Sequence, residues 1–419
     1  MNLLVIGSGG REHAIAKKLN QSPLSETVYC IPGNAGMKLD GIQIKDLSLD
    51  DHDQLIAFAV DHQIDWTIIG PEVPLFNGLA DDFYKNGLSV FGPSKAATLI
   101  EASKAFAKEL MVNQGIPTAA YQVFDEYEKA KAYIQAQGAP IVIKADGLAS
   151  GKGVIVAETM EEAQKALKEM MQDNKFGESA SQVVIEECLA GEEFSLMAFV
   201  NGENIFPMPI SQDHKRLLEL DKGPNTGGMG AYSPVPHISE ETVAEAVKRI
   251  LQPAAQGLAD SQTPFTGVLY AGVIATESGP KTIEFNARFG DPETQVVLNR
   301  MESDLVEVIT DILDEKDPDI KWKTTGIDLG VVVAAKGYPE KYDLDILIEP
   351  TESEDTITYY AGVKEKDGHL YSNGGRIYLL EACGESIAEA QQKIYNQLNK
   401  VNSQKVIYRK DIGDKAKRR

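Results

Sequence analysis

The sequence predicts a multidomain protein of mixed α/β and α+β class that begins with a doubly wound parallel sheet. The chain has 419 residues, more than one ordinary hydrophobic core accommodates. Strand and helix patterns alternate over residues 1–102, as they do in open parallel sheets. After residue 102 the pattern changes to a small α+β unit followed by longer strands. We therefore expect three domains, formed by residues 1–102, 103–325 and 326–419.

The N-terminal region ends each of its apolar strands in a loop of small residues. Strands are expected at 2–6, 27–31, 66–69 and 89–91, and a helix at 11–20. The small-residue loops lie at 7–10, 32–36, 70–72 and 92–94. Ligands of doubly wound sheets bind beyond the carboxyl ends of the strands. These loops are therefore expected to form one wall of a site.

The two later regions contain longer strands and more irregular connections. The central region is expected to have helices at 95–113, 126–137, 161–173 and 240–259, and strands at 121–124, 140–144, 154–157, 182–186, 193–200, 267–276 and around 284. Gly115-Ile-Pro117 stops the first of these helices. The C-terminal region is expected to have strands at 329–335, 356–361 and 376–382, and a helix at 386–401.

Composition excludes several classes of partner. The formal net charge of −22 argues against nucleic acid, whose phosphates such a surface would repel. Cys30, Cys188 and Cys383 are far apart and form no CxxC, which is typical of reduced thiols in a cytoplasmic protein. No signal peptide and no apolar run long enough for a bilayer is recognised. A cytoplasmic protein without a membrane partner is expected, with a solvated basic tail at 415–419.

The segment 283–295 carries the densest chemistry in the chain. Glu284 and Asn286 are two residues apart in a strand pattern, so they point to the same face. A carboxylate and an amide oxygen suit Mg²⁺, which completes its shell with phosphates and water. Arg288 follows as a candidate anion clamp, and the next turn adds Asp291 and Glu293. This combination predicts phosphoryl chemistry.

A lysine followed by a glycine-rich loop gives a second candidate phosphate site. Lys144 ends an apolar strand, and Ser150, Gly151 and Gly153 belong to the loop after it. This is not a Walker A loop, because Gly153 stands where Ser or Thr would follow the lysine. A surface turn with two exposed lysines remains the alternative.

An acidic strand–linker–strand segment, 183–195, can bind the rest of a nucleotide. Adenine can pair with the linker backbone near Glu187 and Leu189, and Glu193 can hold ribose hydroxyls. Acidic hinges are common, so this pattern gains weight only together with Lys144 and Glu284. The polar loops 211–216 and 223–230 add Lys215 and Arg216, which could neutralise a transferring phosphate. A solvated charge cluster remains the alternative there.

The first glycine turn does not match a dinucleotide-binding fingerprint. Gly7-Ser-Gly-Gly-Arg-Glu12 has GxGG spacing, and no acidic ribose partner ends the second strand. The glycines suit close approach of another small anion to a helix N-terminus, with Arg11 helping. A purely structural turn stays open as well. Zinc is not expected, because the histidines show no HxxxH or HExxH spacing.

The order of these segments resembles the ATP-grasp superfamily: Lys104, the strand lysine with its glycine loop, the acidic hinge and the metal strand. Longer motifs resemble one family within it, the phosphoribosylamine–glycine ligases. These motifs are GGREHA at 9–14, PGNAG at 32–36, GPEVPL at 70–75, KADGLASGKGV at 144–154, QDHKR at 212–216, GPNTGGMGAYSP at 223–234 and EFNARFGDPETQ at 284–295. The similarity runs through YRKDIG at 408–413 and so covers essentially the whole chain.

The resemblance implies roles for individual residues. ATP would be held by Lys104, Lys144, Ser150, Gly151, Gly153, Glu186, Glu187, Cys188, Leu189, Glu193, Arg216 and Asn225. Glycine and 5-phosphoribosylamine would be held by Gly9, Gly10, Arg11, Glu12, Gly33, Asn34, Pro71, Glu72, Asp213, Gly228, Arg288, Asp291, Pro292 and Glu293. Lys144, Arg216 and Arg288 would act in catalysis, and Glu284 and Asn286 would bind Mg²⁺ or Mn²⁺. The number of metal ions stays open, because the strand 267–273 carries no further carboxylate.

The resemblance also implies an architecture and a reaction. The central domain would have the ATP-grasp fold with a mobile lid at about 120–190, and residues 326–419 would form a small mixed α/β domain. ATP, glycine and 5-phosphoribosylamine would give ADP, phosphate and glycinamide ribonucleotide through a glycyl phosphate, in purine biosynthesis. The expected state is a monomer, and a transient hand-over of phosphoribosylamine from the preceding amidotransferase stays open.

Three other functions compete with this reading. Another ATP-grasp carboxylate–amine ligase of purine synthesis would share the ATP residues but lack GDPET and GPNTGGMG. A nicotinamide-dependent oxidoreductase would need the missing GxGxxG and ribose acid. A non-catalytic nucleotide-binding module is disfavoured, because metal and phosphate residues are all present.

Overall fold

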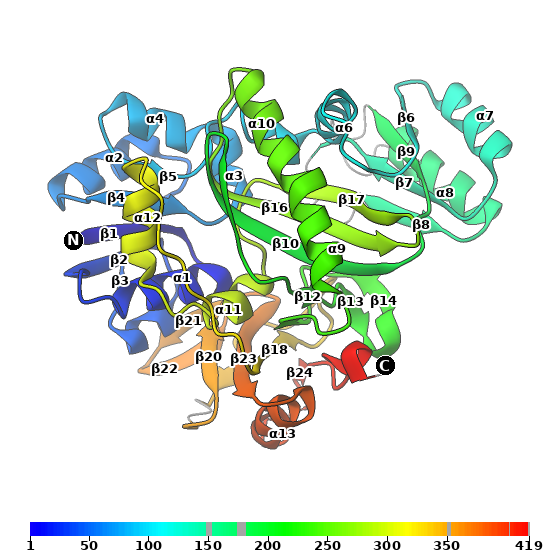
Figure 1. Ribbon diagram of the computed structural model, residues 1–419. Coiled ribbons are helices and arrows are strands. Elements are labelled where there is room, and N and C mark those ends of the chain that lie inside the picture. The colour runs from blue at the N-terminus through cyan, green and yellow to red at the C-terminus, as the bar shows by residue number, and fades with distance from the viewer. Residues whose placement is uncertain (148–152, 174–181, 350–352, 402, 418–419) are drawn as a thin grey trace.

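The N-terminal region is the parallel sheet that the sequence predicts. The computed structural model describes residues 1–147, 153–173, 182–349, 353–401 and 403–417 (Figure 1). The sheet has the strand order β3-β2-β1-β4-β5 and is parallel throughout. Its strands are β1 (Asn2–Gly7), β2 (Thr27–Pro32), β3 (Gln43–Ile44), β4 (Trp66–Ile69) and β5 (Val90–Phe91). Its helices are α1 (Gly10–Asn20), α2 (His52–Asp61), α3 (Glu72–Asn77) and α4 (Leu79–Lys85). The order reverses at β1, so the loops after β1 and β4 open at the switch point where ligands bind.

A four-stranded antiparallel sheet, ordered β11-β10-β16-β17, forms the centre of the molecule. Its strands are β10 (Glu192–Asn201), β11 (Asn204–Pro207), β16 (Thr266–Thr276) and β17 (Gly279–Asn286). Helices α6 (Lys104–Asn113), α9 (Glu240–Ala246) and α10 (Gln252–Asp260) cover one of its faces through Leu110, Ala246 and Leu258 (Figure 1). A π-helical segment, Val247–Leu251, joins α9 to α10 just before Pro253, whose ring disfavours regular helix bonding.

The helix predicted at 95–113 is interrupted. The structure has α5 (Leu99–Ala102) and then α6, with Ser103 extended between them. Ser103 caps α6 by accepting a hydrogen bond from the amide of Phe106, and Asp146 accepts the amide of Lys104 at 2.6 Å. The break therefore directs the start of α6 toward the loop that begins at Asp146.

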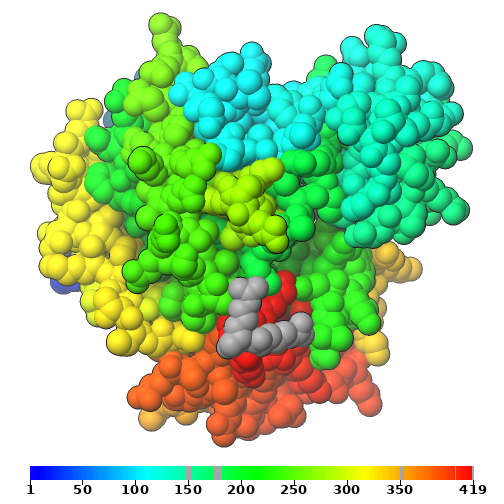
Figure 2. All heavy atoms as spheres, turned by 45° about the vertical axis from the view of Figure 1, so that its right-hand side comes forward, coloured from blue at the N-terminus to red at the C-terminus, as the bar shows by residue number. Residues whose placement is uncertain are grey.

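The described residues between 120 and 190 form a separate lobe, which we call the lid. Its four-stranded antiparallel sheet has the order β6-β9-β7-β8 and carries two helices. The elements are β6 (Tyr121–Phe124), α7 (Tyr127–Gln137), β7 (Ile141–Ala145), β8 (Val154–Ala157), α8 (Met160–Met171) and β9 (Val183–Glu187). The lid has its own apolar core, which includes Ile134, Ile143 and Leu167. It projects from the molecule as a distinct lobe at the upper right of Figure 2.

The C-terminal sheet takes strands from both sides of residue 325. Its order is β12-β15-β18-β23-β20, with β24 paired to β18. The strands are β12 (Gln212–Asp213), β15 (Gly230–Ser233), β18 (Ile327–Ala335), β20 (Ile357–Tyr360), β23 (Arg376–Gly384) and β24 (Val406–Ile407). Helix α13 (Ile387–Leu398) packs on this sheet. The divisions near 102 and 325 stay predictions, and the second one cuts through a sheet.

Smaller elements complete the molecule. They are the hairpin β13 (Arg216–Leu218) and β14 (Lys222–Asn225), the sheet of β19 (Leu347–Ile348), β22 (His369–Ser372) and β21 (Val363–Lys366), and helices α11 (Glu293–Leu298) and α12 (Leu305–Leu313). Helices α11 and α12 pack against the N-terminal sheet through Val297 and Ile309. Within the residues described, no helix is long and apolar enough to cross a bilayer.

Candidate active site

Strand β17 presents Glu284 and Asn286 on its open face. Phe285 between them is buried in the core, as strand alternation requires. The pairing of β16 with β17 shifts register at Gly272 and Val273, which leaves Ile283 as a bulged residue. Gly272 lies opposite Glu284, and a Cβ there would come within 3.2 Å of Glu284 Cγ. Glycine at this position therefore leaves room for the Glu284 side chain.

Two lysines share one buried carboxylate between the lid and β17. Lys144 Nζ lies 2.9 Å from Glu186 Oε2 and donates to the carbonyl of bulged Ile283 at 3.1 Å. Lys108 Nζ lies 3.2 Å from Glu186 Oε1 and donates to Thr118 at 2.7 Å. Burial lowers the pKa of Lys108 to about 8, although Glu186 opposes this effect.

A third lysine of this group comes from the start of α6. Lys104 Nζ donates to the carbonyl of Gly147 at 3.1 Å, at the entrance to the glycine loop. Burial lowers the pKa of Lys104, and the negative charge of Glu284 partly offsets that effect. Ser150 and Gly151 of the predicted phosphate loop lie outside the described residues. Gly153 is buried, and its carbonyl accepts the amide of Ala145 at 2.8 Å.

The residues before the β13–β14 hairpin bring a fourth lysine to β17. Lys215 Nζ lies 3.7 Å from Glu284 Oε1 and 3.9 Å from Glu193 Oε2. Arg216 and Asn225 pair across the hairpin, and Arg216 donates to the carbonyl of Gly223 at 2.9 Å. Burial raises the pKa of Glu284, but Lys215, Lys144 and Lys104 outweigh burial and lower it overall. The glutamate is therefore held as a carboxylate among cations.

The acidic hinge lies between β9 and β10, where the sequence predicts the adenine site. Glu186 uses its carboxylate for the two lysines and pairs through β9 with the strands on both sides. The Glu187 carboxylate accepts the amide of Ala120 at 3.0 Å and pairs with Lys281 at 3.1 Å. Cys188 and Leu189 are partly exposed in the linker that follows.

The N-terminal loops meet the segment after β17 in a network of ion pairs. Arg288 Nη2 lies 3.0 Å from Glu101, and its Nε lies 3.1 Å from Glu72 without the alignment of a hydrogen bond. Arg11 pairs with Glu12 at 2.5 Å and donates to the carbonyl of Phe289 at 3.1 Å. The burial cost to Arg288 is outweighed by Glu101 and Glu72, which raise its pKa. Arg288 is thus a fixed cation at the junction.

Glycines give the Glu12 carboxylate its place beside these loops. Glu12 accepts the amide of Gly9 at 2.6 Å. A Cβ on Gly70, at the end of β4, would come within 2.1 Å of Glu12 Oε1. Gly10, Gly33 and Pro71 lie in the same set of loops. Asn34 donates to the carbonyls of Ser8 and Tyr360 at 2.8 and 2.9 Å and accepts the amide of Gly36, so its side chain is fully used in holding the loop.

The segment Asp291–Glu293 is also engaged by protein partners. Asp291 pairs with Arg376 at 2.7 Å, and Pro292 packs where a Cβ on Gly228 would come within 2.3 Å. Glu293 is buried and accepts from Ser195 at 3.1 Å and Tyr270 at 3.0 Å. Its role as a direct substrate ligand stays a prediction.

Asp213 on β12 lies behind this network. Burial raises the pKa of Asp213 to about 7, with Lys215 opposing and Glu293 reinforcing the shift. Asp213 in turn raises the pKa of Lys215 well above its usual range. Asp213 and Lys215 therefore influence one another electrostatically beside Glu284 and Glu293.

The structure brings the predicted residues together from four places: α6, the lid, the hairpin and β17. It also adds Lys108, Glu101 and Arg376, which the sequence reasoning does not single out. Lys108 sits one helical turn after Lys104, and that spacing is the signal that could have found it. Glu101 and Arg376 give no comparable signal, because their partners are distant in the chain.

The donor set fits a divalent cation that arrives with a nucleotide. Among the residues described, no cluster of three or more His, Cys, Asp or Glu could bind a metal ion by itself. Glu284 and Asn286 offer two oxygen donors on one face, which is the number that Mg²⁺ commonly takes from protein when phosphates supply the others.

This lysine-lined strand beneath a small β-rich lid defines an ATP-dependent ligase of the ATP-grasp class. Family models of the N domain, the ATP-grasp (A) domain and the C domain of phosphoribosylglycinamide synthetase match residues 1–101, 102–294 and 328–415. The chain belongs to the phosphoribosylglycinamide synthetase family. This family carries out the ATP-dependent glycine ligation step of purine biosynthesis, and the chain is a ligase of that kind.

Individual relatives agree with the family match. A phosphoribosylamine–glycine ligase of Streptococcus pneumoniae is 55% identical over 418 residues, covering 99% of this chain and 100% of the relative. One from Listeria innocua is 55% identical over 419 residues, with the same coverage. The crystal structure of the Thermotoga maritima enzyme of that name matches with a TM-score of 0.84 at 33% identity, covering 99% and 100% of the two chains. A biotin carboxylase of Campylobacter jejuni, 16% identical with a TM-score of 0.74, shares the fold over 98% of this chain and 93% of its own.

Proposed function

We propose that the site joins glycine to 5-phosphoribosylamine with ATP, through glycyl phosphate. We also propose that β17 separates the nucleotide side of the site from the side that binds the other two substrates. Glu284 and Asn286 face the nucleotide, and the segment that follows faces glycine and the phosphosugar. The observation that carries this proposal is the convergence of Lys104, Lys144 and Lys215 on Glu284. Three lysines from separate elements form a cationic site around one carboxylate, as transfer of a phosphoryl group requires.

The nucleotide residues act by position and charge. Lys104, Lys144 and Lys215 neutralise the phosphates of ATP. Arg216 and Asn225 contact the phosphate end of the nucleotide. The hinge backbone at Glu187–Leu189 receives adenine, and Glu193 receives the ribose. Mg²⁺ or Mn²⁺ would be held by Glu284 and Asn286 and would stabilise the negative charge that develops on the phosphates. None of these roles requires a protein nucleophile.

The chemistry proceeds in two balanced displacements. A glycine carboxylate oxygen attacks the γ-phosphorus, and the bond to the bridging oxygen of ADP breaks. The amine of phosphoribosylamine then attacks the acyl carbon, phosphate leaves with the carboxylate oxygen, and the amine loses a proton. Arg288 is suited to the anionic glycine and acyl phosphate, because it is a cation held just after β17 by Glu72 and Glu101. The lid limits the access of water to the labile acyl phosphate.

The phosphosugar side is assigned to the N-terminal loops. Gly9–Glu12, Gly33–Asn34 and Pro71–Glu72 lie at the switch point of the parallel sheet, next to Asp291 and Gly228. Arg11 supplies a cation there, and the first amides of α1 supply donors for an anionic group. Asn34 supports this wall through its three hydrogen bonds to the loops rather than through a free amide.

The reaction is tested by measuring ADP release with glycine and with phosphoribosylamine generated in situ. We expect ADP release to require both substrates, and glycine labelled with ¹⁸O in its carboxylate to transfer one label to phosphate. ADP release without either substrate would contradict the assigned reaction. Unlabelled phosphate would rule out glycyl phosphate as the intermediate.

The nucleotide assignment is tested with two lysines of one hairpin region. Lys215→Met should lower kcat/KM for ATP by about 10²-fold, since a charged phosphate contact is lost in a water-poor site. Lys222→Met, an exposed lysine of β14, is the matched control and should change it less than twofold. Equal effects from both variants would contradict the role of Lys215.

The physiological setting is inferred from the same grounds. We infer a cytoplasmic monomer that receives phosphoribosylamine from the amidotransferase reaction that makes it. Sedimentation of the purified chain tests the monomer. A trapping nucleophile added to the coupled reactions tests direct hand-over, because free phosphoribosylamine would be intercepted.

A further inference from the structure

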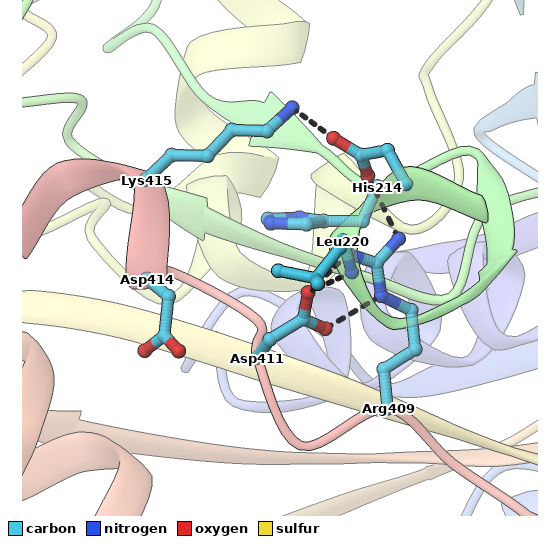
Figure 3. A pocket seen from close by; sticks show the side chains of 7 residues that line it. His214, Leu220, Arg409, Asp411, Asp414 and Lys415 are labelled. Atoms are coloured by element: carbon cyan, nitrogen blue, oxygen red, sulfur yellow. Dashed lines mark hydrogen bonds and ion pairs between the residues drawn. The ribbon is translucent and has the colours of Figure 1, made fainter. Parts of the chain in front are cut away.

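The C-terminal segment Arg409–Lys415, which we call the clasp, lies against the hairpin that carries the nucleotide-side residues. It comes after β24, far in the chain from β13 and β14. Figure 3 shows its side chains around a pocket that is also lined by His214, Leu220 and Asp221.

The β13–β14 hairpin has few internal contacts that would hold it in place. It consists of two short strands whose register is irregular between Arg216 and Leu218. Its turn contains two non-glycine residues in the left-handed region, Leu220 with φ 57° and Asp221 with φ 53°. Leu218 and Leu220 are 45% and 61% exposed, so apolar packing does not hold the turn. An isolated two-stranded hairpin of this kind is marginally stable.

Arg409 connects the clasp to both the strand and the turn of the hairpin. Its Nη1 donates to the carbonyl of Arg216 at 3.0 Å and to Asp221 Oδ1 at 2.9 Å. Its Nε and Nη2 form a bidentate pair with Asp411, each at 2.8 Å. The guanidinium is almost fully buried, so these bonds are shielded from competing water.

Two further contacts hold the strained turn. Asp411 Oδ2 accepts the amide of Leu220 at 2.8 Å, and Lys415 Nζ lies 2.7 Å from Asp221 Oδ2. The two left-handed residues are thus the ones that the clasp contacts. Dashed lines in Figure 3 mark the bidentate pair of Arg409 with Asp411.

The clasp is itself anchored in the C-terminal domain. Gln391 on α13 donates to the carbonyl of Ile412 at 2.6 Å, and Tyr395 donates to the carbonyl of Arg409 at 3.0 Å. Ile412 is fully buried in the core under the C-terminal sheet. The chain of contacts therefore runs from α13 through the clasp to the peptide of Arg216, one residue after Lys215.

We propose that the clasp positions the β13–β14 hairpin for the nucleotide phosphates, with Arg409 as the central positioning residue. This inference rests on the proposed nucleotide role of Lys215 and Arg216. Arg409 touches neither ATP nor glycine. It fixes the carbonyl of Arg216 and the turn, and so sets where Lys215 reaches toward Glu284 and Glu193.

The experiment compares Arg409→Met with Lys364→Met in the full-length enzyme. Lys364 forms an exposed ion pair with Asp345 at 2.7 Å, in the same C-terminal region but away from the hairpin. Arg409→Met should raise the KM for ATP at least fivefold and leave the KM for glycine within twofold. Lys364→Met should change neither. Hydrogen exchange of a peptide covering 216–225 should quicken only in Arg409→Met.

Asp411→Asn provides a second variant that keeps the shape of the side chain, for use if Arg409→Met does not fold. It weakens the acceptor of the Leu220 amide and should shift the KM for ATP and the exchange of 216–225 in the same direction. Unchanged exchange and ATP kinetics in a folded variant would overturn the proposal, as would a parallel rise in both KM values. If Lys215→Met itself leaves ATP kinetics unchanged, the proposed function fails. If only the clasp variants are silent, this inference fails alone.

Discussion

Two junctions in this molecule are held by different kinds of interaction, one apolar and one ionic. The body junction, where the N-terminal sheet meets β10, α11 and α12, is a continuous apolar core that includes Leu3, Phe199 and Val297. The lid junction, where the lid meets β17, is held by Lys108, Glu186 and Lys144 and by the pair of Glu187 with Lys281. The lid keeps its apolar residues within its own core.

The difference shows how one chain can be rigid on one side and responsive on the other. Close-packed side chains fix distances and resist small displacements. Ion pairs with a shared carboxylate can exchange partners, and an anionic nucleotide is a natural competitor for Lys144. The body junction therefore suits the side that we propose to hold the phosphosugar, and the lid junction suits the side that we propose to admit and cover ATP.

The largest effect is expected at β17, where the two junctions meet. Glu284→Ala should lower kcat by at least about 10³-fold, because several kcal/mol of metal-assisted charge stabilisation is lost. Far-UV circular dichroism and the melting temperature should stay close to those of the parent, since Glu284 is outside both apolar cores. Near-normal turnover of this variant at saturating Mg²⁺ would contradict the assignment of Glu284 as a metal ligand.

Breaking the body junction should cost stability throughout the molecule. Phe199 packs between Phe91 of the N-terminal sheet and Phe289 after β17, with ring centroids 6.1 Å from each. Phe199→Ala should lower the free energy of unfolding by about 3–4 kcal/mol through a buried cavity. Urea titration followed by fluorescence measures this loss. A loss confined to the lid, seen by hydrogen exchange, would contradict the comparison.

Breaking the lid junction should have a more local effect. Lys108→Met leaves Glu186 buried with Lys144 alone and should destabilise the lid by about 2 kcal/mol, less than a fully unpaired charge would. Lys144 should then stay paired with Glu186 instead of contacting ATP, and the KM for ATP should rise. Hydrogen exchange of β6 and β9 reports the lid, and Lys129→Met, an exposed pair with Glu126 in the same lobe, is the control. Equal exchange in both variants would argue that Lys108 is dispensable.

The smallest effect concerns pH and the buried His214 beneath the clasp. Burial lowers the pKa of His214 to about 3, against an ordinary value of 6.5. Between these values the unfolded chain binds a proton that the native chain refuses, so stability falls as pH falls from 6.5 toward 3, by up to about 1.4 kcal/mol per pH unit. His214→Gln should therefore lose less melting temperature between pH 7 and pH 5 than the parent does. The exposed His369→Gln is the control, and parallel curves for all three proteins would contradict this origin.

The sequence anticipated features that depend on local periodicity. The strands at 66–69, 121–124 and 154–157 agree with the predicted bounds, because each is a short apolar run with clear turn signals on both sides. Glu284 and Asn286 share a face because strand alternation alone decides it. The parallel N-terminal sheet likewise follows from the alternation of strands and helices.

Features that depend on distant partners were not predictable in the same way. The helix expected at 95–113 breaks at Ser103 because Asp146, which lies in the lid, accepts the amide of Lys104. The β-bulge at Ile283, which turns a carbonyl to Lys144, leaves no trace in the residue pattern. Arg288 was expected as an anion clamp, and its pairing with Glu72 and Glu101 appears only when three separate segments are folded together.

The sheet that crosses residue 325 has a consequence for how the chain is made. β15 needs β18 as its neighbour, and the hairpin needs a clasp that begins at Arg409. Both partners leave the ribosome well after β17, by on the order of ten seconds at ordinary rates of synthesis. The lid core can close before β18 is synthesised, whereas the nucleotide side is completed only after Arg409 has been added. A product that ends before Arg409 should thus carry most of the fold and little of the activity.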